Sequence, residues 1–374
     1  MRVLTVLGTR PEIIRLSRLI PLLDERTEHT LVHTGQNYDD RLSSIFFRDL
    51  GVRAPDVCLD VRESDAGAQI GAILTRIEPV ILERRPDRVL VLGDTNSGLA
   101  AIVARRLGIP VYHMEAGNRC YDDRVPEEIN RRLIDHASSV LMPYTERSRG
   151  NLVREGFSPD RLFVTGNPIG EVLAHHAESI QDSRVLRDLQ LDERQFFLVT
   201  MHRAENVDRE DTLRSLVGAL HRLHAEHRFP VICSLHPRTR SKAERFGVQL
   251  EVPGLRFLPP LGFFDFVRLE QTAACVLSDS GTVQEETCLF GVPNVTLREV
   301  TERPETIECG SNVLAGSDPE RIGEAVAFVL GRRGSWQPPA EYLVRNVAQT
   351  VFRIVTGIRP AELAELEWRQ GLRS

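Results

Sequence analysis

The chain has 374 residues, of which 41% are hydrophobic and 27% are charged, an ordinary balance for a soluble globular enzyme. A chain of that length is longer than a typical domain with a single hydrophobic core, so two domains are expected. The formal net charge of -6 argues against nucleic acid as the main partner, because phosphate binding leaves a clustered basic footprint.

Targeting, membrane and metal signals are also missing from the sequence. A strand-like run begins at Arg2, which leaves no room for a signal peptide, and no apolar run approaches the roughly 18 residues that span a bilayer. We therefore expect a cytoplasmic protein with no membrane partner. The six cysteines are dispersed without a C-x-x-C pair, and Cys233 and Cys275 lie in apolar runs, so neither disulfides nor a metal site are expected. No cofactor is expected either.

Short apolar runs alternate with amphipathic segments from the start of the chain. RVLTVLG precedes a helix expected from about Glu12 to Leu23, HTLVHTG precedes a helix that includes FFRDL, and a long helix is expected from about Ala68 to Leu82. RVLVLG, VYHME, SVLMPY and RLFVTGN continue the alternation. Strands that alternate with helices of this length predict a parallel, doubly wound sheet covered on both faces.

The same pattern begins again in the second half of the chain. A polar stretch from about Glu178 to Asp192 is followed by FFLVTMH, VICSLHP, RFLPPL, CVLSDSG and PNVTL, each with helix-like sequence after it. The prediction is an α/β protein of two Rossmann-like domains, residues 1–170 and 190–356, followed by a C-terminal helix within 357–374.

Three acidic positions cluster in the first predicted domain. Asp94 follows the strand-like RVLVLG, Glu115 lies in HMEAGN after the next strand, and Glu127 follows Pro126 at the start of a helix. In an open parallel sheet, function collects at the carboxyl ends of the strands. Each acid alone could simply cap a helix or a turn. Three acids in one pocket are costly unless chemistry requires them, so we predict a catalytic site.

Candidate anion-binding loops occur in both predicted domains. Gly8, Thr9 and Arg10 stand between a strand and a helix, in a pattern that lacks the G-x-G-x-x-G fingerprint of nicotinamide binding. Ser280 and Gly281 precede a helix in the second domain, and Glu286, about one turn further, could reach ribose hydroxyls. Further basic side chains follow the strands of that domain: His202, Arg203, His236 and Arg238. A capped helix with solvated charges is the alternative for any single loop, but together they predict a ligand between the domains.

Eight motifs make the sequence resemble a known family. GTRPE, GDT, HMEAG, PEEINR, HRAEN, SDSG, QEE and TERPE occur in this order, and the match extends from Met1 to the helix after Ser317. Together they resemble the non-hydrolysing UDP-N-acetylglucosamine 2-epimerases. The resemblance implies two domains of the glycosyltransferase-B type with a UDP-sugar in an interdomain cleft. It also implies a homodimer, a terminal helix that returns to the first domain, and inversion at carbon two by elimination of UDP to a 2-acetamidoglucal and re-addition.

The resemblance also assigns roles to individual residues. It implies catalytic roles for Asp94, Glu115, Glu127, Arg10 and His202. Cationic groups would stabilise the departing diphosphate, while carboxylates stabilise the cation and move the proton. The sequence does not distinguish the roles of the three acids. The substrate contacts that the resemblance implies are Arg15, Arg203, His236, Arg238, Ser280, Gly281, Glu286 and Arg303.

Some positions depart from the usual family pattern. Residue 15 is Arg where many members have Lys. Gln36 lies in GQNYDD, in place of the usual G-Q-H, in a loop that in some members binds a second, activating UDP-N-acetylglucosamine, so Gln36 is a candidate allosteric residue. Other motifs resemble the branch that forms UDP-N-acetyl-L-fucosamine, which leaves a 6-deoxy-L-sugar substrate open beside UDP-N-acetylglucosamine. A glycosyltransferase of the same fold, a hydrolysing 2-epimerase and a non-catalytic nucleotide-sugar sensor are the alternative functions.

Overall fold

The chain folds as two compact units. The computed structural model describes residues 1–35, 40–63, 65–235, 237–250, 252–332 and 334–360. One unit comprises Met1–Val172 with Val344–Ser374, and the other comprises Leu173–Leu343. Each contains a six-stranded sheet in which neighbouring strands are parallel, so the predicted α/β fold with two Rossmann-like domains is confirmed. Across the described ranges, no helix is both long enough and apolar enough to cross a bilayer.

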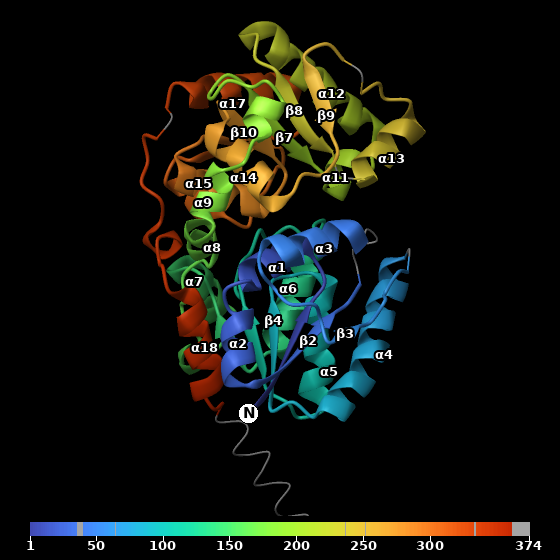
Figure 1. The fold of residues 1–374 in the computed structure, drawn as a ribbon, viewed down its shortest axis with the longest axis vertical. Coiled ribbons are helices and arrows are strands. Elements are labelled where there is room, and N and C mark those ends of the chain that lie inside the picture. Colours follow the sequence, from blue (N-terminus) through green and yellow to red (C-terminus); the bar gives the residue numbers. More distant parts are fainter. Residues whose placement is uncertain (36–39, 64, 236, 251, 333, 361–374) are drawn as a thin grey trace, which may run out of the picture. The chain divides into compact units, whose positions relative to one another are not determined.

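The first unit has the strand order β3-β2-β1-β4-β5-β6, which is the doubly wound order of dinucleotide-binding folds. Figure 1 shows α4 and α5 on one side of this sheet and α2 and α18 on the other. Its elements are β1 (Arg2–Leu7), α1 (Arg10–Leu16), α2 (Ile20–Arg26), β2 (Glu28–His33), α3 (Asp40–Asp49), β3 (Val57–Cys58), α4 (Ala66–Arg84), β4 (Arg88–Leu92), η1 (Asn96–Leu99), α5 (Ala100–Arg106), β5 (Val111–Met114), α6 (Pro126–Ala137), β6 (Val140–Met142), α7 (Glu146–Arg154), η2 (Pro159–Arg161), α8 (Ile169–His175), which spans the boundary, and α18 (Val347–Gly357).

One predicted helix is divided in the structure. The sequence suggested a single helix from about Glu12 to Leu23, but α1 ends at Leu16 and α2 begins at Ile20. Pro21 lies in the first turn of α2, where its missing N–H and fixed φ are tolerated, whereas inside a continuous helix it would remove a hydrogen bond. The break leaves α1 as a short helix beside the loop that follows β1.

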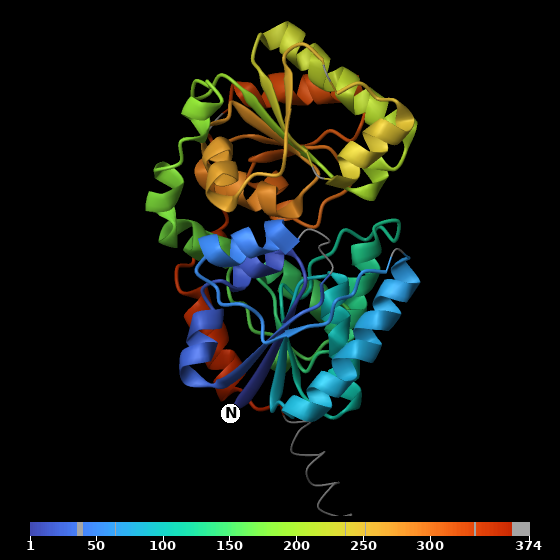
Figure 2. The ribbon, with the colours of Figure 1, turned by 45° about the vertical axis from the view of Figure 1, so that its right-hand side comes forward.

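The second unit repeats the architecture with the order β12-β11-β10-β7-β8-β9. One apolar cluster joins its sheet to α12 and α17, and another joins it to α10, α14 and α15, so both faces are covered (Figure 2). Its elements are α9 (Ala177–Gln181), α10 (Val185–Asp188), β7 (Phe197–Met201), α11 (Ala204–Val207), α12 (Glu210–His227), β8 (Val231–Leu235), α13 (Pro237–Phe246), β9 (Leu255–Leu258), α14 (Phe263–Thr272), β10 (Cys275–Ser278), α15 (Gly281–Phe290), β11 (Asn294–Thr296), α16 (Pro304–Glu308), β12 (Asn312–Leu314), α17 (Pro319–Leu330) and η3 (Ala340–Tyr342).

The chain returns to the first unit earlier than the sequence suggested. α18 turns a buried apolar face inward and packs beside α2 (Figure 1). Arg88 donates a hydrogen bond from Nη1 to the carbonyl of Val355. Residues 344–356, which the sequence placed in the second domain, therefore belong to the first unit because their apolar stripe and backbone are held there. Of the predicted terminal helix within 357–374, residues 361–374 lie outside the described residues.

Candidate functional site

The loop after β1 is organised by a buried glutamate that the sequence analysis missed. Glu12, in the first turn of α1, accepts hydrogen bonds from the backbone N–H groups of Gly8 (3.0 Å) and Thr9 (2.8 Å). With the Thr9 hydroxyl it forms a capping box, the signal that T-x-x-E in GTRPE already carried. The loop is therefore held in one conformation at the carboxyl end of β1.

Glu12 also ties this loop to the one that follows β4. The hydroxyl of Ser97, in η1, donates to Glu12 Oε1 over 2.5 Å, and the Glu12 side chain is only 1% exposed. Burial raises the pKa of Glu12, although these hydrogen bonds act in the opposite direction. The side chain thus links the Gly8–Arg10 loop to the Gly93–Ser97 loop.

Asp94 follows β4 and is paired with a buried arginine. Arg131, 2% exposed in α6, donates from Nη2 to Asp94 Oδ2 and from Nη1 to Glu128. The amide of Asn130 donates to the Asp94 carbonyl over 3.0 Å. Both the charge and the backbone of Asp94 are therefore held by α6, the helix that also carries Glu127 in its first turn.

The adjacent acids Glu127 and Glu128 have different environments because successive helical residues point in different directions. Glu128 is fully buried and accepts hydrogen bonds from the backbone N–H groups of Cys120 (3.0 Å) and Tyr121 (3.2 Å). Burial raises its pKa, but these bonds and the charge of Arg131 outweigh burial and leave the pKa below its ordinary value. Glu128 therefore holds the backbone at Cys120 and Tyr121 in place, whereas the Glu127 side chain is half-buried.

Glu115 follows β5 in a strained conformation. Its φ of 64° lies in the left-handed region that non-glycine residues rarely adopt, a kind of strain that clusters at functional sites. Arg15, from α1, donates to Glu115 Oε2, and Asn118 donates to Oε1 over 3.3 Å. The carboxyl carbon of Glu115 lies 4.0 Å from where a Cβ on Gly93 would stand, so this carboxylate faces the loop that carries Asp94.

A buried network fixes the spacing of the two loops that bear Asp94 and Glu115. His113 is in β5. Its Nε2 atom is 2.8 Å from the Gly93 carbonyl oxygen, and its Nδ1 atom is 2.8 Å from Asp135 Oδ1. Arg119 donates to Asp135 Oδ2 over 2.7 Å. Burial raises the pKa of Asp135, but the His113 hydrogen bond and the Arg119 charge outweigh it and lower that pKa overall.

In the first unit, the predicted residues Arg10, Asp94 and Glu115 follow the carboxyl ends of β1, β4 and β5. Arg10 opens α1 and is half-buried, with its guanidinium 5.7 Å from the Phe46 ring. Arg15, a predicted substrate contact, is 2% exposed, and its guanidinium lies between Glu115 and the ring of Tyr144. This geometry makes Arg15 the counter-charge of Glu115.

In the second unit, one buried carboxylate organises the loop after β7. Asp279 follows β10 and accepts hydrogen bonds from the backbone N–H groups of His202 and Arg203, each over 2.9 Å, and from the Asn206 amide over 3.1 Å. Its other oxygen lies 3.0 Å from His202 Nδ1. Burial raises the pKa of Asp279, but the charge and hydrogen bonds of His202 lower it well below its ordinary value. Asp279 orients the His202 ring, and because His202 is 38% exposed, that ring is accessible to a ligand.

The Ser280–Gly281 turn caps α15 and is tightly enclosed. A Cβ on Gly281 would lie 2.9 Å from Glu302 Oε1 and 3.7 Å from the guanidinium carbon of Arg303, so no larger residue fits without displacement. Arg303 is buried and donates from Nε to Glu285. The turn presents a helix N-terminus beside a guanidinium, an arrangement suited to a phosphate group.

Glu286 lies beside a second buried carboxyl group. Glu270, from α14, is fully buried, and Glu286 is 4% exposed. Burial, together with the charge and hydrogen bond of Glu286, raises the pKa of Glu270 well above its ordinary value. The raised pKa favours the protonated form of Glu270, which reduces the repulsion between the two carboxyl groups.

Of the remaining predicted residues, two are described and two are not. Arg238, in α13, is 45% exposed and forms a paired hydrogen bond with Asp208. Arg203 lies 3.7 Å from Glu302. His236 and Gln36 lie outside the described residues, so their roles remain predictions.

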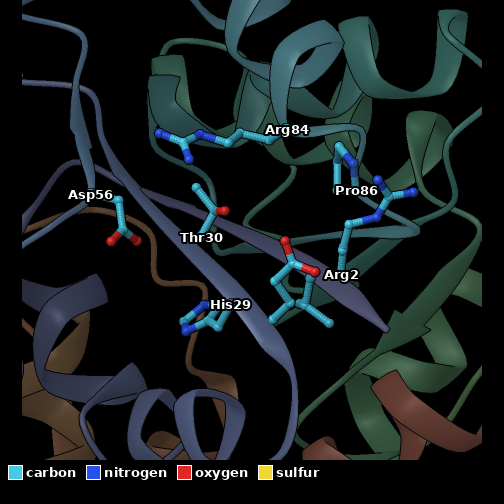
Figure 3. A pocket seen from close by; sticks show the side chains of 8 residues that line it. Arg2, His29, Thr30, Asp56, Arg84 and Pro86 are labelled. Atoms are coloured by element: carbon cyan, nitrogen blue, oxygen red, sulfur yellow. The ribbon is translucent and has the colours of Figure 1, made fainter.

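A separate small cavity lies at the opposite edge of the first sheet. It has a volume of about 140 Å³ and is lined by Arg2 at the start of β1, by His29 and Thr30 in β2, and by Arg84 at the end of α4 (Figure 3). These positions are at the amino ends of the strands, away from the loops that carry the acids. The cavity is therefore not part of the candidate site.

Comparisons with known proteins bear directly on this site. The family model described as UDP-N-acetylglucosamine 2-epimerase matches residues 22–356. The chain belongs to this family. The Methanocaldococcus jannaschii UDP-N-acetylglucosamine 2-epimerase is 39% identical over 347 residues, which cover 91% of this chain and 95% of that protein. Its crystal structure in complex with UDP-GlcNAc and UDP superposes with a TM-score of 0.91 at 37% identity, covering 95% of this chain and 99% of that one.

A further relative and a structural neighbour show how broad the likeness is. A Pseudomonas aeruginosa UDP-2,3-diacetamido-2,3-dideoxy-D-glucuronate 2-epimerase is 40% identical over 335 residues, covering 89% of this chain and 93% of that protein. The glycosyltransferase WaaG has a TM-score of 0.59 at 13% identity, covering 96% of this chain and 100% of its own, a likeness of fold alone. The predicted membership of the non-hydrolysing 2-epimerases, the glycosyltransferase-B type of fold and the isomerase class are confirmed.

Proposed function

We propose that this 2-epimerase acts on UDP-N-acetylglucosamine and inverts carbon two to give UDP-N-acetylmannosamine. The observation that carries the proposal is the pair of carboxylates Asp94 and Glu115, each balanced by its own buried guanidinium at the carboxyl ends of neighbouring strands. The Methanocaldococcus jannaschii relative, whose structure contains UDP-GlcNAc and UDP, supports the choice of substrate.

The reaction requires elimination before or with proton transfer. The hydrogen at carbon two of a hexosamine is not acidic, because no carbonyl group is adjacent to it. Loss of the diphosphate from carbon one leaves an oxocarbenium-like centre that makes this hydrogen removable. In our proposal, Asp94, Glu115 and Glu127 stabilise that centre, remove the proton and return one to the opposite face. UDP then adds back to the 2-acetamidoglucal.

The second unit would hold the nucleotide diphosphate. Ser280 and Gly281 at the start of α15, with Arg303 beside them, form a site for phosphate oxygens. His202, oriented by Asp279, and Arg10 of the first unit would stabilise the charge that develops on the departing diphosphate. Glu286 would bind the ribose hydroxyls. Arg203 and Arg238 remain proposed substrate contacts.

A uronic acid substrate is the second candidate, because the Pseudomonas aeruginosa relative is named for a diacetamido glucuronate.

We also propose that the protein is cytoplasmic and forms a homodimer. Size-exclusion chromatography with light scattering would test the oligomeric state.

Proton NMR in deuterated water, with a panel of UDP-sugars, tests the proposed function. UDP-N-acetylglucosamine should convert to UDP-N-acetylmannosamine with deuterium incorporated at carbon two and without accumulation of free UDP. Preferential turnover of the diacetamido uronate or of a 6-deoxy-L-sugar would identify a different substrate. Stoichiometric release of UDP and free sugar would indicate a hydrolysing enzyme, and no exchange with any sugar would overturn the proposal.

A further inference from the structure

Two cysteines that lie far apart in the sequence meet inside the second unit. Cys288 is in the last turn of α15, and Cys309 caps the end of α16. Their sulfur atoms are 3.7 Å apart. The 21-residue separation explains why the sequence showed no paired-cysteine pattern. Neither residue takes part in the proposed epimerisation.

One of the two thiols is accessible from a cavity. Cys288 is buried, whereas Cys309 is partly exposed and lines an open cavity of about 500 Å³. Because Cys309 lines this cavity and Cys288 does not, a small polar oxidant would meet Cys309 first. The site is formed at the amino end of β12, whereas Gly281 lies at the other end of α15.

The surroundings of Cys309 favour its thiolate. The neighbouring Cys288 thiol lowers the pKa of Cys309 and outweighs the opposing effect of burial, and the hydroxyl of Ser311, 3.4 Å from the sulfur, acts in the same direction. The hydrogen bond with Cys309 and burial raise the pKa of Cys288, which stays a thiol. One nucleophilic sulfur and one resolving sulfur are thus in contact.

We propose that Cys288 and Cys309 form a site of reversible oxidation, in which a peroxide converts the two thiols to an intramolecular disulfide. The Cys309 thiolate attacks a peroxide oxygen, the O–O bond breaks, and hydroxide leaves to become water, which gives a sulfenic acid. The Cys288 sulfur then attacks the Cys309 sulfur and loses its proton, and the sulfenic hydroxyl leaves as a second water. Two electrons pass from the thiols to the peroxide, and a thiol reductant reverses the step.

Hydrogen peroxide titration of the full chain, in a Cys58→Ser background that removes an exposed thiol, tests the proposal. Mass spectrometry of peptides prepared without reductant should show a Cys288–Cys309 link with a loss of two hydrogens, reversed by dithiothreitol. Buried Cys233 and Cys275 should remain reduced, and Cys233→Ser should not change the result. Cys288→Ser should abolish the link and leave Cys309 over-oxidised.

A second measurement uses only the wild-type chain and therefore does not depend on whether the cysteine variants fold. In the wild-type chain at pH 6.5, Cys309 should react with iodoacetamide several-fold faster than Cys58, because a larger fraction of it is thiolate. Slower reaction of Cys309 than of Cys58, a sulfinic acid at Cys309 in the wild-type chain with no cross-link, or a cross-link that involves another cysteine would each overturn the proposal.

Discussion

The two units share a fold but arrange their charged side chains in opposite ways. In the first unit, carboxylates are held by guanidinium groups: Arg131 pairs with Asp94, and Arg15 pairs with Glu115. In the second unit, the buried carboxylate of Asp279 instead holds a histidine and two backbone N–H groups in place. In the proposed function, the first unit presents balanced acids to the ligand, whereas the second presents the start of α15 and positive charge.

The comparison shows how a repeated architecture acquires two different chemistries. Both sheets have the same strand order, and in both units the functional side chains follow the carboxyl ends of the strands. In the proposed function, the loops alone decide whether that edge moves protons or binds phosphate. A substitution on one side of this division should therefore leave the other side unchanged.

The largest expected effect is on the stability of the first unit. Arg131→Met should lower the free energy of unfolding by about 3–5 kcal/mol, because it removes the guanidinium that pairs with the fully buried Glu128 and with the partly buried Asp94. Arg132→Met is the matched control: Arg132 is 36% exposed and should change stability by less than about 1 kcal/mol. Urea denaturation measures both, and equal effects of the two variants would contradict this role of Arg131.

Turnover is the next most sensitive property. Asp94→Asn, Glu115→Gln and Glu127→Gln should each lower kcat on the order of a hundredfold or more, the scale of acid–base groups. The exposed Glu78→Gln variant on α4 serves as the control and should retain wild-type kcat. Rates are measured by NMR of the UDP-sugar. Near-native turnover in all three acid variants would remove these residues from the mechanism.

On the other side of the comparison, Asp279→Asn should destabilise the second unit by about 2 kcal/mol at pH 7, because Asp279 is buried and holds His202. The pKa of Asp279 is lowered by folding, so its contribution is fully present above its unfolded value of about 4 and is lost as the pH falls through the folded pKa. The difference from wild type should therefore shrink below about pH 4.

Urea denaturation between pH 3 and pH 7 checks the Asp279 prediction. Asp211→Asn provides a control, since the pKa of Asp211 is also lowered, to about 2, but this side chain is solvent-exposed in α12. That control should be close to wild type at pH 7. A difference for Asp279→Asn that does not vary with pH would rule out a charge-based role.

The smallest effect concerns Glu270, whose pKa is raised by folding. Its stabilising contribution is complete below the unfolded pKa of about 4.3 and is lost as the pH rises toward the folded pKa. Glu270→Gln keeps a neutral donor, so relative to wild type it should gain about 1.4 kcal/mol of stability for each pH unit between the unfolded pKa and the folded pKa of Glu270. The exposed Glu324→Gln should show no such gain in thermal denaturation. A Glu270→Gln variant that loses stability with rising pH would show that the charged form is required.

Much of the fold was predictable because strand and helix patterns are local. Apolar runs followed by helix-like segments required two parallel sheets, and the structure contains them. The sequence prediction placed the return of the chain to the first unit too late. The apolar stripe of α18 carries no local signal of the unit that it packs against, so only its tertiary contacts assign it. The break between α1 and α2 had a local signal in Pro21, which the sequence analysis did not use.

The site was less predictable because its residues are paired across long stretches of sequence. Asp94, Glu115 and Ser280 were identifiable from their places after strands. Their partners were not, since Arg15 and Glu115 are 100 residues apart and His202 and Asp279 are 77 apart. Spacing within α6 did offer a signal for Arg131, which lies three residues after Glu128 on the same face.

The most direct test of the division between the units is UDP affinity, measured by calorimetry in Asp94→Asn and Gly281→Ala. The added Cβ in Gly281→Ala would lie 2.9 Å from Glu302 Oε1 and disturb the proposed phosphate loop. We expect Asp94→Asn to bind UDP within about twofold of wild type while losing turnover, and Gly281→Ala to bind UDP at least about tenfold more weakly, a change of about 1.4 kcal/mol. Weakened UDP binding in Asp94→Asn together with unchanged binding in Gly281→Ala would contradict the account.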